Sequence, residues 1–316
     1  MKKILIYEYI TGGGLSNEDL SSELMFEAKN ILSSVIKSCN ISTNFDYKYF
    51  IDYRLSGLHT DKSIIIQKSS DLYNTSLIKK FDYIIPIIPE INSDLLKYVK
   101  FLERNKINKI ISDSETINIC SDKLMFYQYL HKTCIPVVKT FSTTNFNKDS
   151  KKYIIKDRFG AGCSYVRVTN RKDLEKYYCK DKVIQPFVKA QNYSISVFFS
   201  RYSFRLLTLN EQNLASKKNM LKVNSLTINS KNNLYAKILL LLNNLKKIMP
   251  GLFGFIGIDI LVKGSEVYII EINPRLTTSY VGLHETIGCN MIDLLVNHKY
   301  IKNVITSRKH HLLNYE

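Results

Sequence analysis

Two short apolar segments, each interrupted by one acidic residue, lie close together toward the C-terminal end of this 316-residue chain. The first carries Asp259 and the second carries Glu271, with a Gly-Ser pair between them. β-Branched residues on both sides of such a pair predict a hairpin. A three-residue loop, in which Lys263 faces Val267, would place Asp259 directly opposite Glu271.

This hairpin indicates a metal site. Residues two apart on a strand share a face, so Asp259, Glu271 and Asn273 should project from the same side. Two carboxylates this close repel each other unless a cation lies between them. Oxygen ligands suit Mg²⁺ (or Mn²⁺), which commonly binds one or two protein carboxylates and completes its shell with water and phosphates. The alternative is a polar, solvated sheet face, which isolated acids in apolar strands make the weaker interpretation.

The formal net charge of +17 allows three classes of partner: nucleic acid, an anionic membrane surface or acidic small molecules. The lysines occur as dispersed pairs, such as Lys79–Lys80, and never as a long block. Abundant Ile, Asn and Lys with few Arg residues are typical of an AT-rich genome, which explains most of the charge. We therefore expect small-molecule substrates and no nucleic-acid partner.

The six cysteines show neither close pairing nor metal-ligand spacing, which is typical of reduced thiols in the cytosol. Acidic Glu8 and Gly12 interrupt the first apolar run before a signal peptide could form. The other apolar runs are far shorter than a membrane span. We expect a soluble cytoplasmic protein with no membrane partner, and the sequence leaves its oligomeric state open, a homodimer included.

Strand-like and helical patterns alternate from the N-terminus to about Ser112. This alternation predicts a small parallel α/β domain over residues 1–112. Glu90 follows one of its strands, at the position where open α/β sheets hold ligands, although an exposed loop acid is an equal alternative. The expected elements are strands at 3–10, 63–66, 82–86 and 109–111, and helices at 21–36 and 92–103.

The rest of the chain predicts two α+β units, at residues 113–184 and 185–316. Ser121 is the expected N-cap of a helix that reaches Leu130. The polar, basic stretch 210–229 is expected to be a mobile loop, and 234–248 a helix. The loop contains Lys217 and Lys218, which either close over a triphosphate or are simply solvated.

Lys156 ends an apolar strand just before a glycine-bearing turn that contains Gly160 and Gly162. Glycines let backbone N–H groups approach phosphate oxygens, and the lysine adds a positive charge. The pattern is weak when taken alone, because glycine hairpins usually serve only the turn. It is not the Walker pattern, since no lysine and hydroxyl residue close the loop.

The ordered set of an Asp-Lys helix, a strand lysine with its glycine loop, and the Glu-Ile-Asn-Pro-Arg segment ending at Arg275 resembles the ATP-grasp ligases. The resemblance covers about residues 113 to 300 and implies an ATP-grasp fold behind an N-terminal α/β domain. It further implies that Lys123 and Lys156 contact ATP phosphates. The resemblance also implies an adenine hinge and a ribose contact, at Gln185, Phe187, Val188 and Asn192. Many members carry an acid at the position of Asn192 and a proline at that of Asp157.

Short segments, including Glu8-Tyr9 and the residues after Arg275, are similar to the tyramine–glutamate ligase group. That group joins glutamate to an aromatic amine in methanofuran-type cofactor synthesis. Arg275 suits a carboxylate or phosphate because its planar fork binds bidentately, although it could instead pair with an acid of the protein. Tyr9 is expected to stack against the aromatic acceptor. Further substrate contacts are expected at Glu8, Gly13, Thr277, Thr278 and Ser279, with a simple turn as the alternative at the glycines.

The resemblance therefore implies an ATP- and Mg²⁺-dependent ligase that forms an amide through an acyl phosphate, with Arg275 and Lys156 as catalytic residues. Glutamate and a tyramine-like amine are the expected substrates. The alternatives are another ATP-grasp amino-acid or peptide ligase and, from a different class, a basic nucleic-acid-binding protein.

Overall fold

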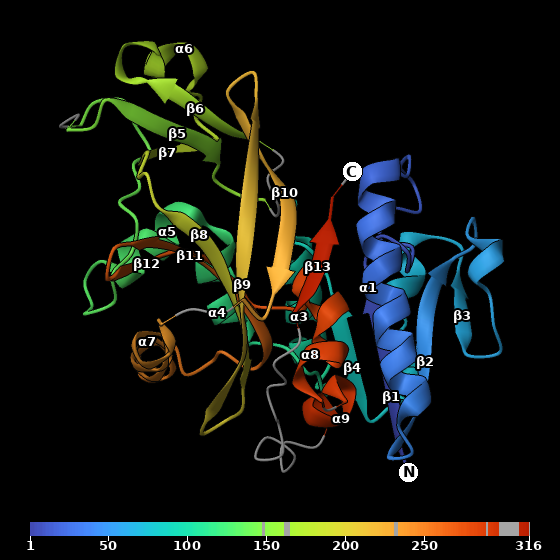
Figure 1. The fold of residues 1–316 in the computed structure, drawn as a ribbon. Coiled ribbons are helices and arrows are strands. Elements are labelled where there is room, and N and C mark those ends of the chain that lie inside the picture. The colour runs from blue at the N-terminus through green and yellow to red at the C-terminus, as the bar shows by residue number, and fades with distance from the viewer. Residues whose placement is uncertain (147–148, 161–164, 231–232, 289, 297–309, 316) are drawn as a thin grey trace.

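Two β-sheets organise the chain in the computed structural model (Figure 1). The structure describes residues 1–146, 149–160, 165–230, 233–288, 290–296 and 310–315. Among these residues, no helix is both long enough and apolar enough to cross a membrane.

The N-terminal sheet is parallel, with the strand order β3-β2-β1-β4. Its strands are β1 (Lys2–Glu8), β2 (Phe45–Asp52), β3 (Ser63–Ile66) and β4 (Tyr83–Ile87). The helices that belong to it are α1 (Ser22–Ile41), α2 (Thr75–Ile78) and α3 (Asp94–Arg104). The expected parallel α/β architecture is confirmed, but the sequence interpretation missed β2. The segment expected as a strand at 109–111 contributes only one isolated bridge, between Lys109 and Ile84.

The second sheet is antiparallel and has the order β12-β11-β8-β9-β10-β6-β5-β7, with β13 beside β10. Its first strands are β5 (Lys152–Asp157), β6 (Val166–Asn170), β7 (Lys182–Pro186) and β8 (Gln191–Phe199). The others are β9 (Phe204–Lys217), β10 (Met220–Ile228), β11 (Gly254–Lys263), β12 (Glu266–Asn273) and β13 (His311–Asn314). One residue pair, Met220 with Arg167, joins β10 to β6. The strands β5 to β7 therefore form a small unit beside the larger one, and β7 continues two residues past the expected division at 184.

A long hairpin formed by β9 and β10 occupies most of the stretch expected to be a mobile loop, so that expectation is wrong. Lys217 pairs with Met220, and the two residues between them, Lys218 and Asn219, have φ angles of 53° and 63°. Positive φ at both central residues is the geometry of a type I′ turn, which matches the twist of paired strands. The outer half of the hairpin is largely exposed, so it lacks the buried apolar face that makes a strand visible in a sequence.

Two short helices, α4 (Ser114–Ser121) and α5 (Lys123–Leu130), join the two sheets. The expected N-cap at Ser121 is wrong, because Ser121 is the last residue of α4. Asp122 caps α5 instead, and its carboxylate accepts hydrogen bonds from the backbone N–H groups of Leu124 and Met125. Arg158 also forms an ion pair with this carboxylate, in which Nη2 of Arg158 lies 2.6 Å from Oδ2 of Asp122.

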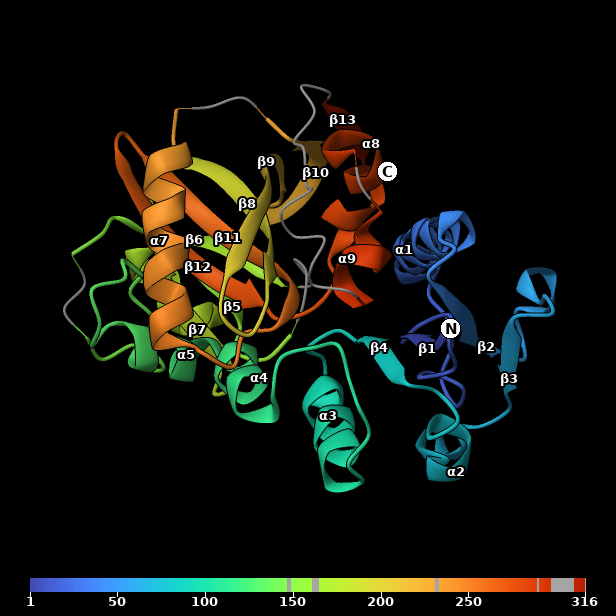
Figure 2. The same ribbon diagram turned by 90° about the horizontal axis from the view of Figure 1, so that it is seen from below.

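Helices cover both sides of the larger sheet. The amphipathic helix α7 (Tyr235–Ile248) packs Ile238, Leu242 and Leu245 against β8 and β11 (Figure 2). The remaining helices are α6 (Leu174–Tyr177), α8 (Leu283–Ile287) and α9 (Met291–Val296). Four 3₁₀ segments complete the described elements, at Ser56–Leu58, Ser69–Tyr73, Arg171–Asp173 and Thr278–Gly282.

One hydrophobic core crosses the boundary between the N-terminal domain and the rest of the chain. Ile31 and Val35 of α1 belong to the same buried cluster as Leu283 of α8 and Met291 of α9. Figure 2 shows α9 facing α1 across this boundary. The buried apolar surface holds the N-terminal domain against the larger sheet, and this fixes the edge at which the candidate site lies.

Candidate active site

The hairpin of β11 and β12 brings the two predicted metal-binding carboxylates together. Lys263 faces Glu266 across a two-residue turn, so the expected three-residue loop is wrong. A β-bulge then leaves Ile270 unpaired and restores the register, so that Asp259 lies opposite Glu271 as expected. Bulges of this kind often adjoin active sites, where they re-aim side chains.

Asp259, Glu271 and Asn273 lie on one side of this hairpin. Asp259 is paired with Glu271 across the two strands, and Asn273 donates a hydrogen bond to Asp259. The Asp259 carboxylate accepts hydrogen bonds from Asn273 Nδ2 at 3.2 Å and from Gln212 Nε2 at 2.9 Å. Gln212 comes from β9, inside the stretch expected to be a loop, and the sequence interpretation missed its role. Had the segment around Gln212 been recognised as a strand, its position beside Asp259 could have been predicted.

Glu271 lies between two lysines from different elements. Its Oε2 atom is 3.7 Å from Lys123 Nζ and 3.6 Å from Lys156 Nζ. Lys123 opens α5 and also donates a hydrogen bond to the Gly160 carbonyl at 2.9 Å. The structure therefore brings both predicted phosphate-binding lysines, the glycine turn and the carboxylates into one site. Gly162 lies outside the described residues.

The two carboxylates differ in acidity. Burial, followed by the neighbouring Glu271 charge, raises the pKa of Asp259 to about 7. Burial also acts to raise the pKa of Glu271, but Lys123 and Lys156 outweigh it and hold that pKa below its usual value. At neutral pH the site therefore has one fully ionised carboxylate and one that is close to its midpoint.

This donor set fits Mg²⁺. Asp259 and Glu271 offer carboxylate oxygens, and Asn273 offers an amide oxygen, because its Nδ2 is the atom that faces Asp259. An oxygen-only set with two carboxylates is typical of Mg²⁺ sites that also bind substrate phosphates. The two lysines beside Glu271 supply the positive charge that balances this carboxylate without a metal.

The residues expected at an adenine hinge and at a ribose contact lie in the small unit's last strand, β7, or in the residues that follow it. Gln185 is buried in β7 and donates a hydrogen bond to Thr140 Oγ1 at 2.9 Å. Phe187 is 37 % exposed, and Val188 is half-buried in the connection to β8. Asn192 is half-buried at the start of β8, where it pairs with Leu261 of β11. Their contacts with a nucleotide stay a prediction.

Arg275 follows β12 and forms an ion pair with Glu90 of the N-terminal domain. Its Nε and Nη2 atoms donate to Glu90 Oε2 at 3.0 and 2.8 Å, and Nη1 donates to the Leu276 carbonyl at 3.0 Å. Both side chains are largely buried, with exposed fractions of 12 % and 4 %. The alternative of a protein acid as the partner of Arg275 is therefore observed, while Arg275 retains further N–H groups.

Comparisons with known proteins agree with this geometry. A family model described as an ATP-grasp domain matches residues 120–279, which span the site from α4 to the segment after Arg275. The chain belongs to the ATP-grasp family. Its fold is similar to that of an ATP-grasp superfamily protein from Archaeoglobus fulgidus, with a TM-score of 0.79 and 21 % identity over 99 % of this chain and 92 % of the other.

Two curated relatives of this ATP-grasp protein have the same name. The tyramine–L-glutamate ligase of Methanocaldococcus fervens is 27 % identical over 286 residues, which cover 89 % of each chain. The tyramine–L-glutamate ligase of Methanocaldococcus jannaschii is 26 % identical over 284 residues, covering 89 % of this chain and 84 % of the relative. In both cases the similarity extends beyond the ATP-grasp domain into the N-terminal domain.

The hydroxyl groups expected to bind substrate are hydrogen-bonded inside this ATP-grasp protein. Ser279 is buried, and its Oγ lies 2.8 Å from Ser196 Oγ and 3.0 Å from Thr277 Oγ1. Thr278 donates a hydrogen bond to Glu27 of α1. These contacts brace the segment after Arg275 against β8 and the N-terminal domain, and a direct substrate contact stays a prediction.

Two of the residues expected to bind substrate have a structural role in the loop after β1. Glu8 is buried and accepts hydrogen bonds from the N–H groups of Thr11 at 2.7 Å and Ile10 at 3.2 Å. Gly13 has a φ of 87°, and a Cβ atom there would lie 2.6 Å from Ile66 Cγ2. The turn interpretation of the glycines is therefore observed, and a substrate contact at Glu8 or Gly13 stays a prediction.

Tyr9 does not have the free ring that stacking on a substrate requires. Its side chain is buried, and its hydroxyl donates a hydrogen bond to Asp94 at 2.8 Å. Stacking of Tyr9 against an aromatic acceptor would require the ring to leave this buried position, and it stays a prediction. The local sequence gave no sign of Asp94, which lies 85 residues away on α3.

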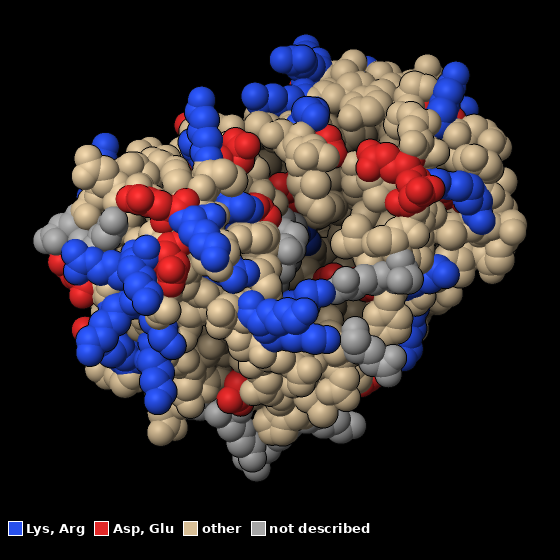
Figure 3. Space-filling model, turned by 90° about the horizontal axis from the view of Figure 1, so that it is seen from above, with Lys and Arg blue, Asp and Glu red and all other residues tan. Residues whose placement is uncertain are grey.

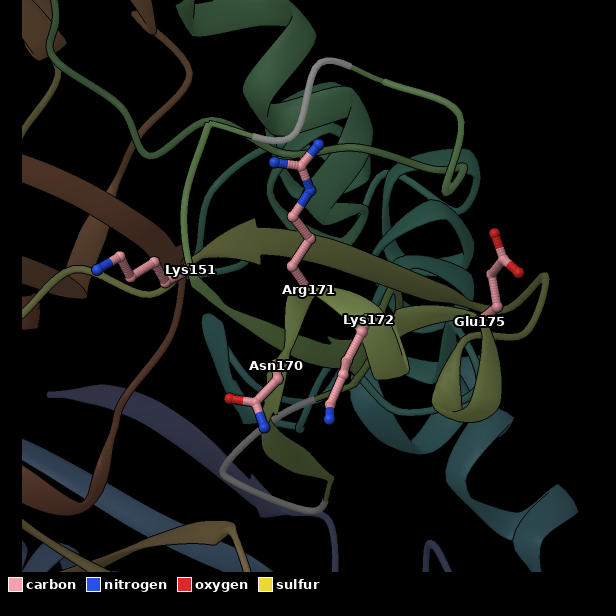
Figure 4. Close-up of a pocket in the computed structure, with 5 residues that line it drawn as sticks. All are labelled: Lys151, Asn170, Arg171, Lys172 and Glu175. Atoms are coloured by element: carbon pink, nitrogen blue, oxygen red, sulfur yellow. The ribbon is translucent and has the colours of Figure 1, made fainter.

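A separate surface hollow of about 530 Å³ lies on the small unit of this ATP-grasp protein. It is at the Lys152–Asn170 end of β5 and β6, whereas Lys156 is at the other end. Figure 4 shows its side chains pointing apart from one another, so no polar groups converge there. The residues around it are Lys151, Asn170, Arg171, Lys172 and Glu175.

Proposed function

We propose that this protein is an ATP- and Mg²⁺-dependent ligase that joins glutamate to a tyramine-like amine through an amide bond. One observation carries the proposal: Glu271 lies beside Asp259 and within 3.7 Å of both Lys123 and Lys156, in a chain of the ATP-grasp family. The name shared by the two Methanocaldococcus relatives supports the choice of substrates.

The nucleotide would bind between the small unit and β11–β12. Lys123 and Lys156 would contact its phosphates, with Gly160 beside them, and the connection after Gln185 would contact the adenine. Asp259, Glu271 and Asn273 would hold the metal. When bound, Mg²⁺ neutralises phosphate charge and acts as a Lewis acid and template. Phosphates that draw the lysines toward themselves would leave Glu271 free for this role.

The reaction proceeds in two steps. A carboxylate oxygen of glutamate attacks the γ-phosphorus of ATP, the bond from this phosphorus to the bridging oxygen breaks, and ADP leaves. The neutral amine then attacks the carbonyl carbon of the acyl phosphate, inorganic phosphate leaves, and the nitrogen loses a proton. Such transfers depend on positioning and charge neutralisation, which Lys156 and Arg275 would supply. The site must also exclude water, which would hydrolyse the intermediate.

Another ATP-grasp amino-acid or peptide ligase would use the same site, because the fold alone does not set the substrates. We keep a cytoplasmic location and the absence of a nucleic-acid partner as predictions, and leave the oligomeric state, a homodimer included, open.

ADP release across amino acids, each with a panel of amines, tests the function. We expect release only when an amino acid and an amine are both present, with glutamate and tyramine-like amines preferred. AMP and pyrophosphate as products would overturn the acyl-phosphate chemistry. Release with glutamate but no preference for aromatic amines would discard only the tyramine-like acceptor.

A further inference from the structure

The strand order of the N-terminal sheet reverses at β1, between β2 and β4. From β1 the chain runs outward through β2 and β3, then returns to place β4 on the other side of β1. Open parallel sheets bind ligands outside the carboxyl ends of the strands at such a switch point. Glu90 lies three residues beyond the end of β4, at this edge, and its ion pair with Arg275 joins it to the ATP-grasp domain.

One oxygen of Glu90 has no partner. Oε2 accepts both hydrogen bonds from Arg275, whereas the buried Oε1 accepts none from the residues that the structure describes. Buried polar atoms are almost always hydrogen-bonded, so an exception calls for an explanation. A ligand group that donates a hydrogen bond would supply the missing partner.

Arg275 complements this acceptor. Within the described part of the chain it uses three N–H groups, two on Glu90 and one on the Leu276 carbonyl. A guanidinium carries five, so two remain for a ligand. A free carboxylate oxygen beside free guanidinium donors matches a molecule that has an ammonium group and a carboxylate attached to the same carbon atom, which is the arrangement in an α-amino acid.

The surrounding charge also favours a cation. Glu27 of α1 accepts a hydrogen bond from Thr278, three residues after Arg275. Glu27 and Glu90 together carry two negative charges against the single positive charge of Arg275. The side of the site formed by the N-terminal domain therefore has a net negative charge, in contrast to the two lysines on the ATP side.

We propose that Glu90 is a specificity residue that receives the ammonium group of the amino-acid substrate on Oε1, while Arg275 beside it receives a carboxylate oxygen. This assignment rests on the proposed function for the identity of the substrate. It does not require turnover, because the contacts belong to substrate binding.

Calorimetric binding in the presence of Mg²⁺ and a non-hydrolysable ATP analogue tests the assignment on the unmodified protein. L-Glutamate should bind at least about tenfold more tightly than glutarate, which lacks the ammonium group, because a hydrogen bond to a charged group contributes this much. N-Acetyl-L-glutamate, which has no positive charge, should also bind at least about tenfold more weakly. Equal affinities for the three ligands would overturn the proposal.

The Glu90→Gln variant tests whether the preference for glutamate over glutarate comes from Glu90. Glutamine keeps an acceptor for Arg275, so the ATP analogue should bind unchanged, while the preference for glutamate over glutarate should fall by about tenfold or more. Glu115→Gln, at an exposed glutamate of α4, is the matched control and should keep the preference. Equal weakening of glutamate and glutarate would mean that Glu90 only positions Arg275, and would overturn the proposal.

Two further outcomes distinguish a failure of the Glu90 assignment from a failure of the proposed function. If Glu90→Gln weakens binding of the amine and leaves the glutamate preference intact, the ammonium group belongs to the amine and the proposal is wrong. If the unmodified protein binds glutamate selectively but releases no ADP with any amine, the proposed function fails while the assignment of Glu90 stands.

Discussion

Glu271 is the residue on which the charges of the site converge. Its carboxylate balances two largely buried lysines when no nucleotide is bound, and it is also the proposed metal ligand. Glu271→Gln should abolish most Mg²⁺-dependent turnover and lower the free energy of unfolding of the ligand-free protein by about 1–3 kcal/mol, because buried cations lose their partner. Urea unfolding and ADP release measure both effects. Glu266→Gln, on the exposed end of the same strand, should change neither.

The raised pKa of Asp259 makes metal binding depend on pH. Asp259 must lose its proton to bind a cation, and its pKa of about 7 means that the fraction without a proton falls as the pH drops from 8 to 6. Over this interval, Mn²⁺ affinity should weaken by about tenfold. Mn²⁺ titrations followed by electron paramagnetic resonance would measure it. A constant affinity between these pH values would show that Asp259 either is not a ligand or ionises normally.

Lys156 gives a test of the nucleotide site. Lys156→Ala should remain folded and bind ATP at least about tenfold more weakly, because a charge-assisted phosphate contact contributes roughly 1.5–3 kcal/mol. Lys152→Ala removes an exposed lysine from the other end of the same strand and is the control. Equal ATP affinity in the two variants would exclude a phosphate contact by Lys156.

At the scale of elements, the turn of the β9–β10 hairpin has a sequence that is unfavourable for its backbone conformation. Lys218 has a positive φ, which a lysine adopts at a cost, and Asn-Gly is the preferred pair for this turn. The double variant Lys218→Asn with Asn219→Gly should raise the free energy of unfolding by about 1 kcal/mol. Chemical denaturation measures the gain. A tenfold loss of ATP affinity in this variant would instead favour the alternative that Lys218 closes over the phosphates.

The elements also mark how far the sequence could predict this structure. The helices at α1, α3 and α7 and most strands followed from periodicity, and the pairing of Asp259 with Glu271 was correct although the turn was not. The bulge at Ile270 compensated for that error. Exposed strands such as the outer part of β9 carry no apolar alternation. Contacts between distant elements, above all Glu90 with Arg275, have no local signature because they join residues 185 positions apart.

At the scale of the whole molecule, the site depends on how the N-terminal domain is docked. The shared core between α1, α8 and α9 holds that domain, and the ion pair of Glu90 with Arg275 crosses the same boundary. The ATP side of the site comes from the small unit and the β11–β12 hairpin. The substrates would therefore meet between three parts of the chain, which is an arrangement that can exclude water.

The net charge of +17 gives the last prediction. Figure 3 shows basic side chains spread over the face seen from above, with acidic side chains among them and a hollow near its centre. Proteins that read nucleic acids concentrate positive charge along one groove, whereas a diffuse field attracts small anions such as ATP and glutamate. We therefore expect no submicromolar binding of duplex or single-stranded nucleic acid at physiological salt.

Fluorescence anisotropy with labelled oligonucleotides, measured across a salt series, checks this expectation. Weak binding that disappears by moderate salt is compatible with it, because any strongly basic protein shows such binding. The apparent affinity for ATP should also decrease with salt, but less steeply, since ATP replaces fewer counterions than a nucleic acid does. Tight binding that persists at physiological salt would instead point to a nucleic-acid partner and make the charge a functional feature rather than a consequence of composition.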